Sequence, residues 1–206
     1  MTEGDTVETL VVRHLADIEG AVRYLQDVLE PKLWEAISVA MESWAEERDW
    51  VRNIDPETEG DYWLAPRAWQ VPDNEDDAEF YFALTVIPQE DGEDITSVTS
   101  FIGASARGNR YVLLFEREHP KKKRAWQALL GRSEPLLQQL REKGFDTDTR
   151  AGTICYPVSL DAIKLGLAFA DDDFEAALEP LMAALFQAEQ ALTLFDDLAG
   201  AARTAS

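Results

Sequence analysis

The sequence predicts an α+β fold, a single domain in which a four- to five-stranded, mainly antiparallel sheet packs against N-terminal and C-terminal helices. Apolar residues recur at helical spacing near both ends of the chain, and runs rich in aromatic and β-branched residues, separated by short polar turns, fill its middle. No linker or internal repeat divides the 206 residues. We therefore assign residues 1–198 to one domain and the small, polar residues 199–206 to a flexible tail.

The first helix is predicted from a capping-box-like start at Asp5-Thr6-Val7-Glu8 and from the apolar stripe that follows it. The stripe has spacings of 4, 3, 4, 3 and 4 and comprises Val11, Leu15, Ile18, Val22, Leu25 and Leu29. A stripe this regular is most often part of a core, so we expect it to be buried. Pairing with the last helix and a homodimer interface are the alternatives.

Pro31 fits the first position of a second helix, because its missing amide hydrogen is not needed there. This helix should extend to about Arg48. Its inner face is predicted to carry Leu33, Ile37, Met41 and Trp44.

Four consecutive strands joined by short polar turns predict an antiparallel meander. The expected strands are Tyr62–Val71, Phe80–Ile87, Thr96–Ser105 and Arg110–Arg117. Pro66 marks an edge or a bulge in the first strand, and the strongly apolar second strand should be central. A tight hairpin turn is expected at Arg107-Gly108-Asn109.

The last part of the chain is predicted to return to helices, with one more strand between them. Helical segments should start at Pro120 and restart at Ser133-Glu134-Pro135, and Gly144 should end them. Gly152–Val158 is the expected fifth strand. Asp171–Asp173 should cap a long final helix that is kinked or restarted at Pro180.

The charge of the chain limits its partners. It has 19 Lys and Arg against 40 Asp and Glu, a net charge of −21, and residues 1–100 alone hold 25 acidic and 6 basic side chains. Phosphates and anionic lipids would be repelled, so we expect no direct binding to nucleic acid or membranes and expect a basic protein partner instead. Residues 107–124 form an exception, with a local charge of +5 from 7 basic and 2 acidic side chains.

The composition also limits the cellular location of the protein and the disulfide or metal chemistry that it can support. Cys155 is the only cysteine, which excludes an intramolecular disulfide and a cysteine-based zinc site within one chain. The first residues lack the basic and apolar regions of a secretory signal, and no apolar run is long enough to cross a membrane. A cytoplasmic protein is the resulting expectation.

Two sets of residues are candidates for partner binding. Trp63 and Trp69 are six residues apart, so they should share one strand face, either as an aromatic groove or as a wall of the core. The basic set comprises Arg107, Arg110, Lys121, Lys122, Lys123 and Arg124. The lysine-rich run either contacts a partner or balances the acidic half of the chain.

No residue pattern predicts catalysis or a cofactor. His14 and His119 have no neighbouring ligand, Cys155 lies in an apolar strand, and no nucleophile elbow or phosphate loop is present. Two acidic turns are either solvated or weak cation sites: Asp73, Glu75, Asp76 and Asp77, and Glu90, Asp91, Glu93 and Asp94. We expect no cofactor, and a non-enzymatic role is favoured.

The order of helix, three or four strands, helix and strand over residues 1–160 resembles the αβββαβ core of the PD-(D/E)XK nuclease-like superfamily. That family holds Mg²⁺ with an Asp before one strand and a Glu-x-Lys on the next. The nearest residues are Asp61 and Glu79-Phe80-Tyr81, where Tyr81 replaces the lysine. Glu30-Pro31-Lys32 spells the tripeptide but lies at a helix junction.

The same order and the acidity also look similar to small acidic secretion-chaperone-like folds, which implies protein partners bound through helices and a sheet. The sequence thus favours a non-enzymatic acidic protein-binding module, an inhibitor or accessory factor of a basic or nucleic-acid-binding partner. The alternative is a divergent metal-dependent hydrolase that uses Asp61 and Glu79.

Overall fold

The structure is a computed structural model that describes residues 6–54, 62–72, 74, 77–88, 96–117 and 123–204. Its six-stranded sheet has the order β1-β2-β3-β4-β6-β5, and every neighbouring pair is antiparallel. The strands are β1 (Trp50–Asn53), β2 (Tyr62–Pro66), β3 (Phe80–Ile87), β4 (Arg110–Arg117), β5 (Asp146–Asp148) and β6 (Thr153–Pro157). The predicted α+β fold with an antiparallel sheet is confirmed, and the sheet has one strand more than expected.

Helices make up most of the remaining structure. Those before β4 are α1 (Val7–Arg13), α2 (Leu15–Tyr24), the π-helical turn η1 (Leu25–Leu29), α3 (Glu30–Arg48), the 3₁₀ turn η2 (Arg67–Trp69) and α4 (Ser97–Phe101). Those after it are α5 (Lys123–Arg132), α6 (Glu134–Glu142), α7 (Ala162–Asp171), α8 (Glu179–Gln190) and α9 (Leu192–Thr204). None of these described helices combines the length and the apolar character that a membrane crossing requires.

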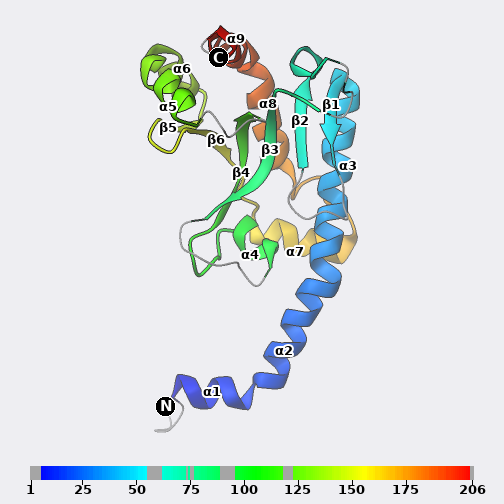
Figure 1. The fold of residues 1–206 in the computed structure, drawn as a ribbon. Helices are drawn as coiled ribbons and strands as arrows, with labels where there is room; N and C mark the ends of the chain where they lie inside the picture. The colour runs from blue at the N-terminus through cyan, green and yellow to red at the C-terminus, as the bar shows by residue number, and fades with distance from the viewer. Residues whose placement is uncertain are drawn as a thin grey trace.

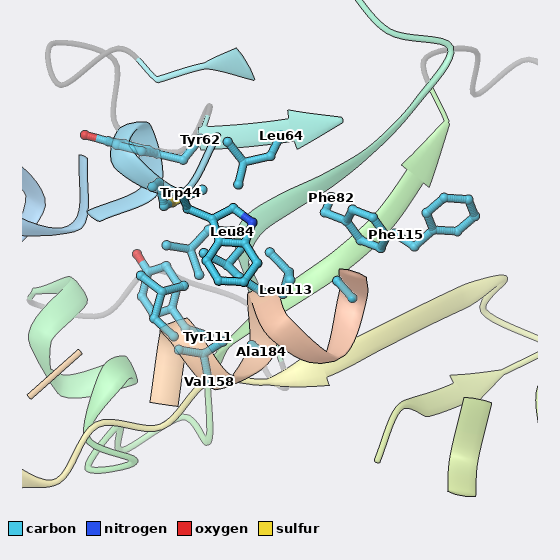
Figure 2. Close-up of a cluster of buried hydrophobic side chains, with 14 of the residues drawn as sticks. Trp44, Tyr62, Leu64, Phe82, Leu84, Tyr111, Leu113, Phe115, Val158 and Ala184 are labelled. Atoms are coloured by element: carbon cyan, nitrogen blue, oxygen red, sulfur yellow. The ribbon is translucent and has the colours of Figure 1, made fainter. Parts of the chain in front are cut away.

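The core lies between the sheet and the helices. Figure 1 shows α8 behind β3 and β4, and α3 beside β1. Directly paired residues of antiparallel strands point to one face, so Phe82 with Phe115 and Leu84 with Leu113 form neighbouring buried pairs. Figure 2 shows these four side chains in one cluster with Ala184 of α8. We call this side of the sheet the inner face.

Helix α3 follows the sequence prediction closely. Its buried residues include the four that were expected, and Pro31 lies in its first turn. Because Pro31 has no amide hydrogen, the helix immediately before it widens into η1, where the Glu30 amide donates to the Leu25 carbonyl. The chain is therefore helical from α2 through η1 into α3.

The prediction of a strand at Thr96–Ser105 is wrong, because the helix α4 occupies this segment. A short helix places Val98 and Phe101, three residues apart, toward the core together, and both are buried. The ring of Phe101 stacks on that of Tyr111 at 3.6 Å. The residues at Arg107-Gly108-Asn109 consequently connect α4 to β4 and form no hairpin between strands.

The meander instead begins one strand earlier, at β1, and continues through β2 and β3 to β4. β1 and the short β5 were both missed. The first expected strand also ends early, because the chain turns into η2 after Pro66.

The C-terminal helices differ from the prediction, which missed α7 and placed the start of the final helix at Asp171–Asp173. Asp171–Asp173 do not cap a long helix, because α7 ends there and Asp172 adopts a left-handed conformation with φ of 56°. α8 begins at Glu179 with Pro180 in its first turn, as the restart prediction requires. α9 continues through Thr204 and buries Ala199 and Ala202, so the flexible tail expected from residue 199 is helical and packed over this stretch.

Candidate functional site

The first candidate site is the N-terminal arm, which we define as residues 7–29 (α1, α2 and η1). Figure 1 shows α1 and α2 leading away from the sheet and its covering helices. None of these three segments buries a residue. The expectation that the apolar stripe belongs to the core is therefore wrong for this part of the chain.

Large apolar side chains are exposed along the arm. Between 42% and 74% of the surface is accessible at Val7, Leu10, Val11, Val12, Leu15, Ile18 and Tyr24. Val22, Leu25 and Leu29 are partly covered where the arm joins α3. Contiguous exposed apolar surface on a protein marks an interaction site, and a helix this short is only marginally stable without one.

From Val11 onward, the charged residues of the arm lie off its stripe. In heptad positions, Leu15 and Val22 take position a while Ile18 and Leu25 take position d. The outward positions b, c and f hold the charged residues Arg13, Asp17, Arg23 and Asp27, and also the apolar Leu10 and Tyr24. The flanking positions e and g hold no run of like charge; they are Val7, Val12, His14, Glu19, Ala21, Gln26 and Val28.

His14 divides the arm into its two helices. It ends α1 and precedes α2 with φ of −105° and ψ of 16°, outside the helical range, so the axis bends there. Its ring Nδ1 lies 3.3 Å from a carboxylate oxygen of Asp17, on the exposed surface. The side chain of Thr6 caps α1 by accepting from the Thr9 amide.

The second candidate site lies on the outer face of the sheet, opposite the core. Trp63 is paired with Ala83, and Tyr81 with Glu116, so these side chains alternate with the inner residues and point outward. The rings of Trp63 and Tyr81 are 5.4 Å apart and tilted by 39°. We call Trp63, Tyr81 and Glu116 the aromatic–acid site.

Glu116 has an unusual environment for a carboxylate. Partial burial raises its pKa, and a hydrogen bond from Tyr81 opposes that shift only in part. Within the described part of the chain, no Lys or Arg forms an ion pair with Glu116. Sequence reasoning missed Tyr81 and Glu116 as site residues, and only the strand register shows that they are neighbours.

Trp63 and Trp69 do not share a face, contrary to the prediction. The turn η2 after Pro66 breaks the alternation of the strand. Trp69 is 1% exposed, and its ring packs on Phe82 and Phe115 in the core. An aromatic groove made by both tryptophans is thus absent, and Trp63 is the one of the two that reaches the outer surface.

The predicted basic residues are spread over the molecule. Arg107 and Arg110 lie before β4 and at its start, whereas Lys123 and Arg124 begin α5 after its end, and all four are exposed. An eight-residue strand spans about 26 Å, so the two pairs lie far apart along it. Arg110 also has an acidic neighbour, Asp146, at 3.3 Å. Lys121 and Lys122 lie outside the described residues.

The geometry around Glu79 does not favour the metal-site alternative. Its carboxylate accepts from Arg203 at 2.8 Å and lies 3.9 Å from Arg117, so two cations already balance its charge. Asp61 lies outside the described residues, as do most of the acidic-turn residues. Where the structure describes the chain, no three His, Cys, Asp or Glu side chains gather as a metal site would require.

The remaining nucleophile candidate is unreactive in its surroundings. Burial, together with the nearby Asp146 carboxylate, raises the pKa of Cys155 to about 11, although Arg110 opposes the shift. A thiol with this pKa is almost wholly protonated near neutral pH, so Cys155 lacks the character of a catalytic cysteine.

Comparison of the chain with protein-family models, curated proteins and solved structures gave no match.

Proposed function

We propose that this protein is a non-enzymatic, acidic protein-binding module of the cytoplasm that self-associates through its N-terminal arm and carries a second surface for a basic partner. The observation that carries the proposal is the arm itself, which exposes a regular apolar stripe and buries none of its residues. Burial of apolar side chains is the main favourable term in association, so such a stripe is a docking surface.

A second copy of the same chain fits the arm. The arm holds four acidic and two basic residues, a net charge of −2, so two arms repel each other weakly although the whole chain has a net charge of −21. In a parallel pair, position g of one helix faces position e of the other, five residues on. This brings Ala21 of one copy beside Gln26 of the next, with no like charges opposed.

The basic partner follows from the charge of the body. Many of its cations are already paired within the chain, such as Lys32 with Asp172 and Lys164 with Glu179, so the excess carboxylates dominate the surface. A strongly acidic surface accelerates encounter with basic proteins. A nucleic-acid-binding protein is of this class, and an inhibitor or accessory factor of one is the role we assign.

Sedimentation equilibrium of the full chain tests self-association. We expect dimers at micromolar concentration, and Ile18→Glu should weaken the dimer at least about tenfold because it places charge in the seam. Ile163→Glu is the matched control, since Ile163 is an equally apolar, exposed residue of α7 outside the arm. A chain that stays monomeric, or a dimer that both substitutions weaken equally, would overturn the proposal.

A further inference from the structure

The aromatic–acid site resembles two places where this protein holds an arginine. At the first, the guanidinium of Arg48 lies 3.3 Å from the ring centroid of Trp44, and its Nε donates to Glu189 at 3.1 Å. The cation thus lies against an indole and a carboxylate together. This arrangement joins α3 to α8.

The second place is at the edge of the core. Arg117 and Arg203 both lie 5.6 Å from the ring centroid of Phe80, and both approach the carboxylate of Glu79. Here too a guanidinium meets an aromatic ring and a carboxylate in one contact. A planar guanidinium suits both groups, because it stacks on rings and donates parallel hydrogen bonds to carboxylates.

The third aromatic–carboxylate set, Trp63, Tyr81 and Glu116, differs in one respect. Among the described residues, no cation lies over the ring of Trp63, and none pairs with Glu116. Keeping a carboxylate charged on a partly buried, aromatic surface is unfavourable, as the raised pKa of Glu116 reflects. A cation supplied from outside the described chain would offset that penalty.

We propose that the aromatic–acid site binds an arginine side chain of a protein partner, with the guanidinium against the ring of Trp63 or Tyr81 and hydrogen-bonded to the carboxylate of Glu116. This deepens the proposed function by naming the side chain that the basic partner presents. The three residues come from β2, β3 and β4, which are adjacent hydrogen-bonded strands, so the backbone holds them in fixed order.

The dimensions suit a side chain lying flat across the strands. Trp63 and Glu116 lie two strands apart and two residues apart along the strand direction, a distance of about 12 Å, which is within the reach of an extended arginine and its own backbone. The rings of Trp63 and Tyr81, 5.4 Å apart, are too close for a guanidinium to enter between them. The arginine therefore lies on the ring faces that point outward.

The test is an NMR titration of the full chain with a short peptide in which glycines flank one arginine. Shifts should concentrate at the indole N–H of Trp63 and spare that of the buried Trp69. Replacing the arginine by citrulline, which is neutral but similar in shape, should weaken binding about tenfold, and a lysine peptide should bind more weakly than the arginine peptide.

Matched variants separate a specific site from general attraction to an acidic surface. Glu116→Gln should weaken the arginine peptide about tenfold, whereas Glu35→Gln, which removes the same charge from an exposed position of α3, should change the affinity less than about twofold. Equal effects of the two variants, or equal binding of arginine and citrulline peptides, would overturn the site.

Self-association through the arm and arginine binding at the aromatic–acid site can each be refuted without affecting the other. Ile18→Glu should dissociate the dimer and leave peptide binding unchanged, because the arm and the outer face of the sheet share no residue. Loss of peptide binding in Glu116→Gln should leave the dimer intact. Tight binding of the lysine peptide, equal to that of the arginine peptide, would contradict the assignment of arginine.

Discussion

The indole N–H of Trp69 donates a hydrogen bond of 2.7 Å to a carboxylate oxygen of Asp196, 127 residues later in the chain. Trp69 is buried in the core, so its N–H has no access to bulk water. The bond fixes α9 to the turn that follows β2. It lies beside the contacts of Phe195 with Phe82 and Phe115, whose ring centroids are 5.0 and 4.6 Å away.

Removing this acceptor should destabilise the fold. Asp196→Ala leaves the buried indole N–H without its partner, which costs about 1–3 kcal/mol in the free energy of unfolding. Urea denaturation measures the loss. Asp197→Ala is the control, because Asp197 is exposed and adjacent, and its effect should stay within about 0.5 kcal/mol. Equal losses for the two variants would refute the role of the hydrogen bond.

Truncating an apolar side chain should lower the free energy of unfolding much more in the core than in the arm. Leu113 of β4 is fully buried beside Leu84 of β3, so Leu113→Ala should cost about 2–5 kcal/mol of unfolding free energy. Ile18→Ala removes a similar volume from an exposed site and should leave the unfolding of the dilute monomer within about 0.5 kcal/mol. A large loss for Ile18→Ala in dilute solution would mean that the arm is part of the folded core.

Glu116 should make stability depend on pH in the direction opposite to an ion-paired carboxylate. Burial raises its pKa in the folded state, so the native protein holds this proton at pH values where the unfolded chain has released it. Stability is then lost as pH rises from the ordinary range of a carboxyl through the raised pKa. Above that window, Glu116→Gln should be more stable than the original protein.

Urea denaturation at about pH 4 and about pH 8 checks this expectation. At the lower pH the two proteins should unfold at nearly the same urea concentration, because Glu116 is then protonated. The exposed Glu35→Gln variant should show no such gain at the higher pH. A Glu116→Gln protein that is less stable at about pH 8 would show that contacts within the chain stabilise the carboxylate by more than burial destabilises it.

Cys155 should react slowly with thiol reagents while the protein is folded. Its pKa of about 11 leaves little thiolate at about pH 8, and burial blocks the approach of the reagent. We expect the rate of reaction with a disulfide reagent to rise by about a hundredfold or more when urea unfolds the chain. Similar rates in the folded and unfolded protein would contradict the buried position.

Local sequence patterns predicted the central elements well. β3 and β4 begin and end at the residues expected, because long apolar runs bounded by polar residues leave few other choices. α3 was equally clear, since Pro31 marks its start and its inner face has regular spacing. These segments are ones in which the local preference and the tertiary environment agree.

The errors arose where contacts distant in sequence decide the structure. Thr96–Ser105 is rich in β-branched residues, yet the stacking of Phe101 on Tyr111 and the hydrogen bond from Trp34 to Ser97 accompany a helix there. The spacing of apolar residues in the sequence identifies the apolar stripe of the arm. It does not show whether other parts of the chain cover that stripe. Burial is a property of the whole fold.

The aromatic–acid site illustrates the same limit. Trp63 was a candidate because it is aromatic, but Glu116, which lies on the same face of the sheet, is 53 residues away in the chain. Only the registers of β2 with β3 and of β3 with β4 bring the two to one face. A sequence pattern gives the side of a strand on which a residue lies, and not the residue opposite it.

The short strand β5 also affects how copies of this protein meet. It is an edge of the sheet, where unpaired backbone groups are a template for sheet-to-sheet aggregation. β5 has only three residues and carries Asp146 and Asp148 at its ends, so a second edge approaching it would meet two carboxylates and little backbone to pair with. At high concentration, this edge should therefore resist growth of the sheet into fibrils.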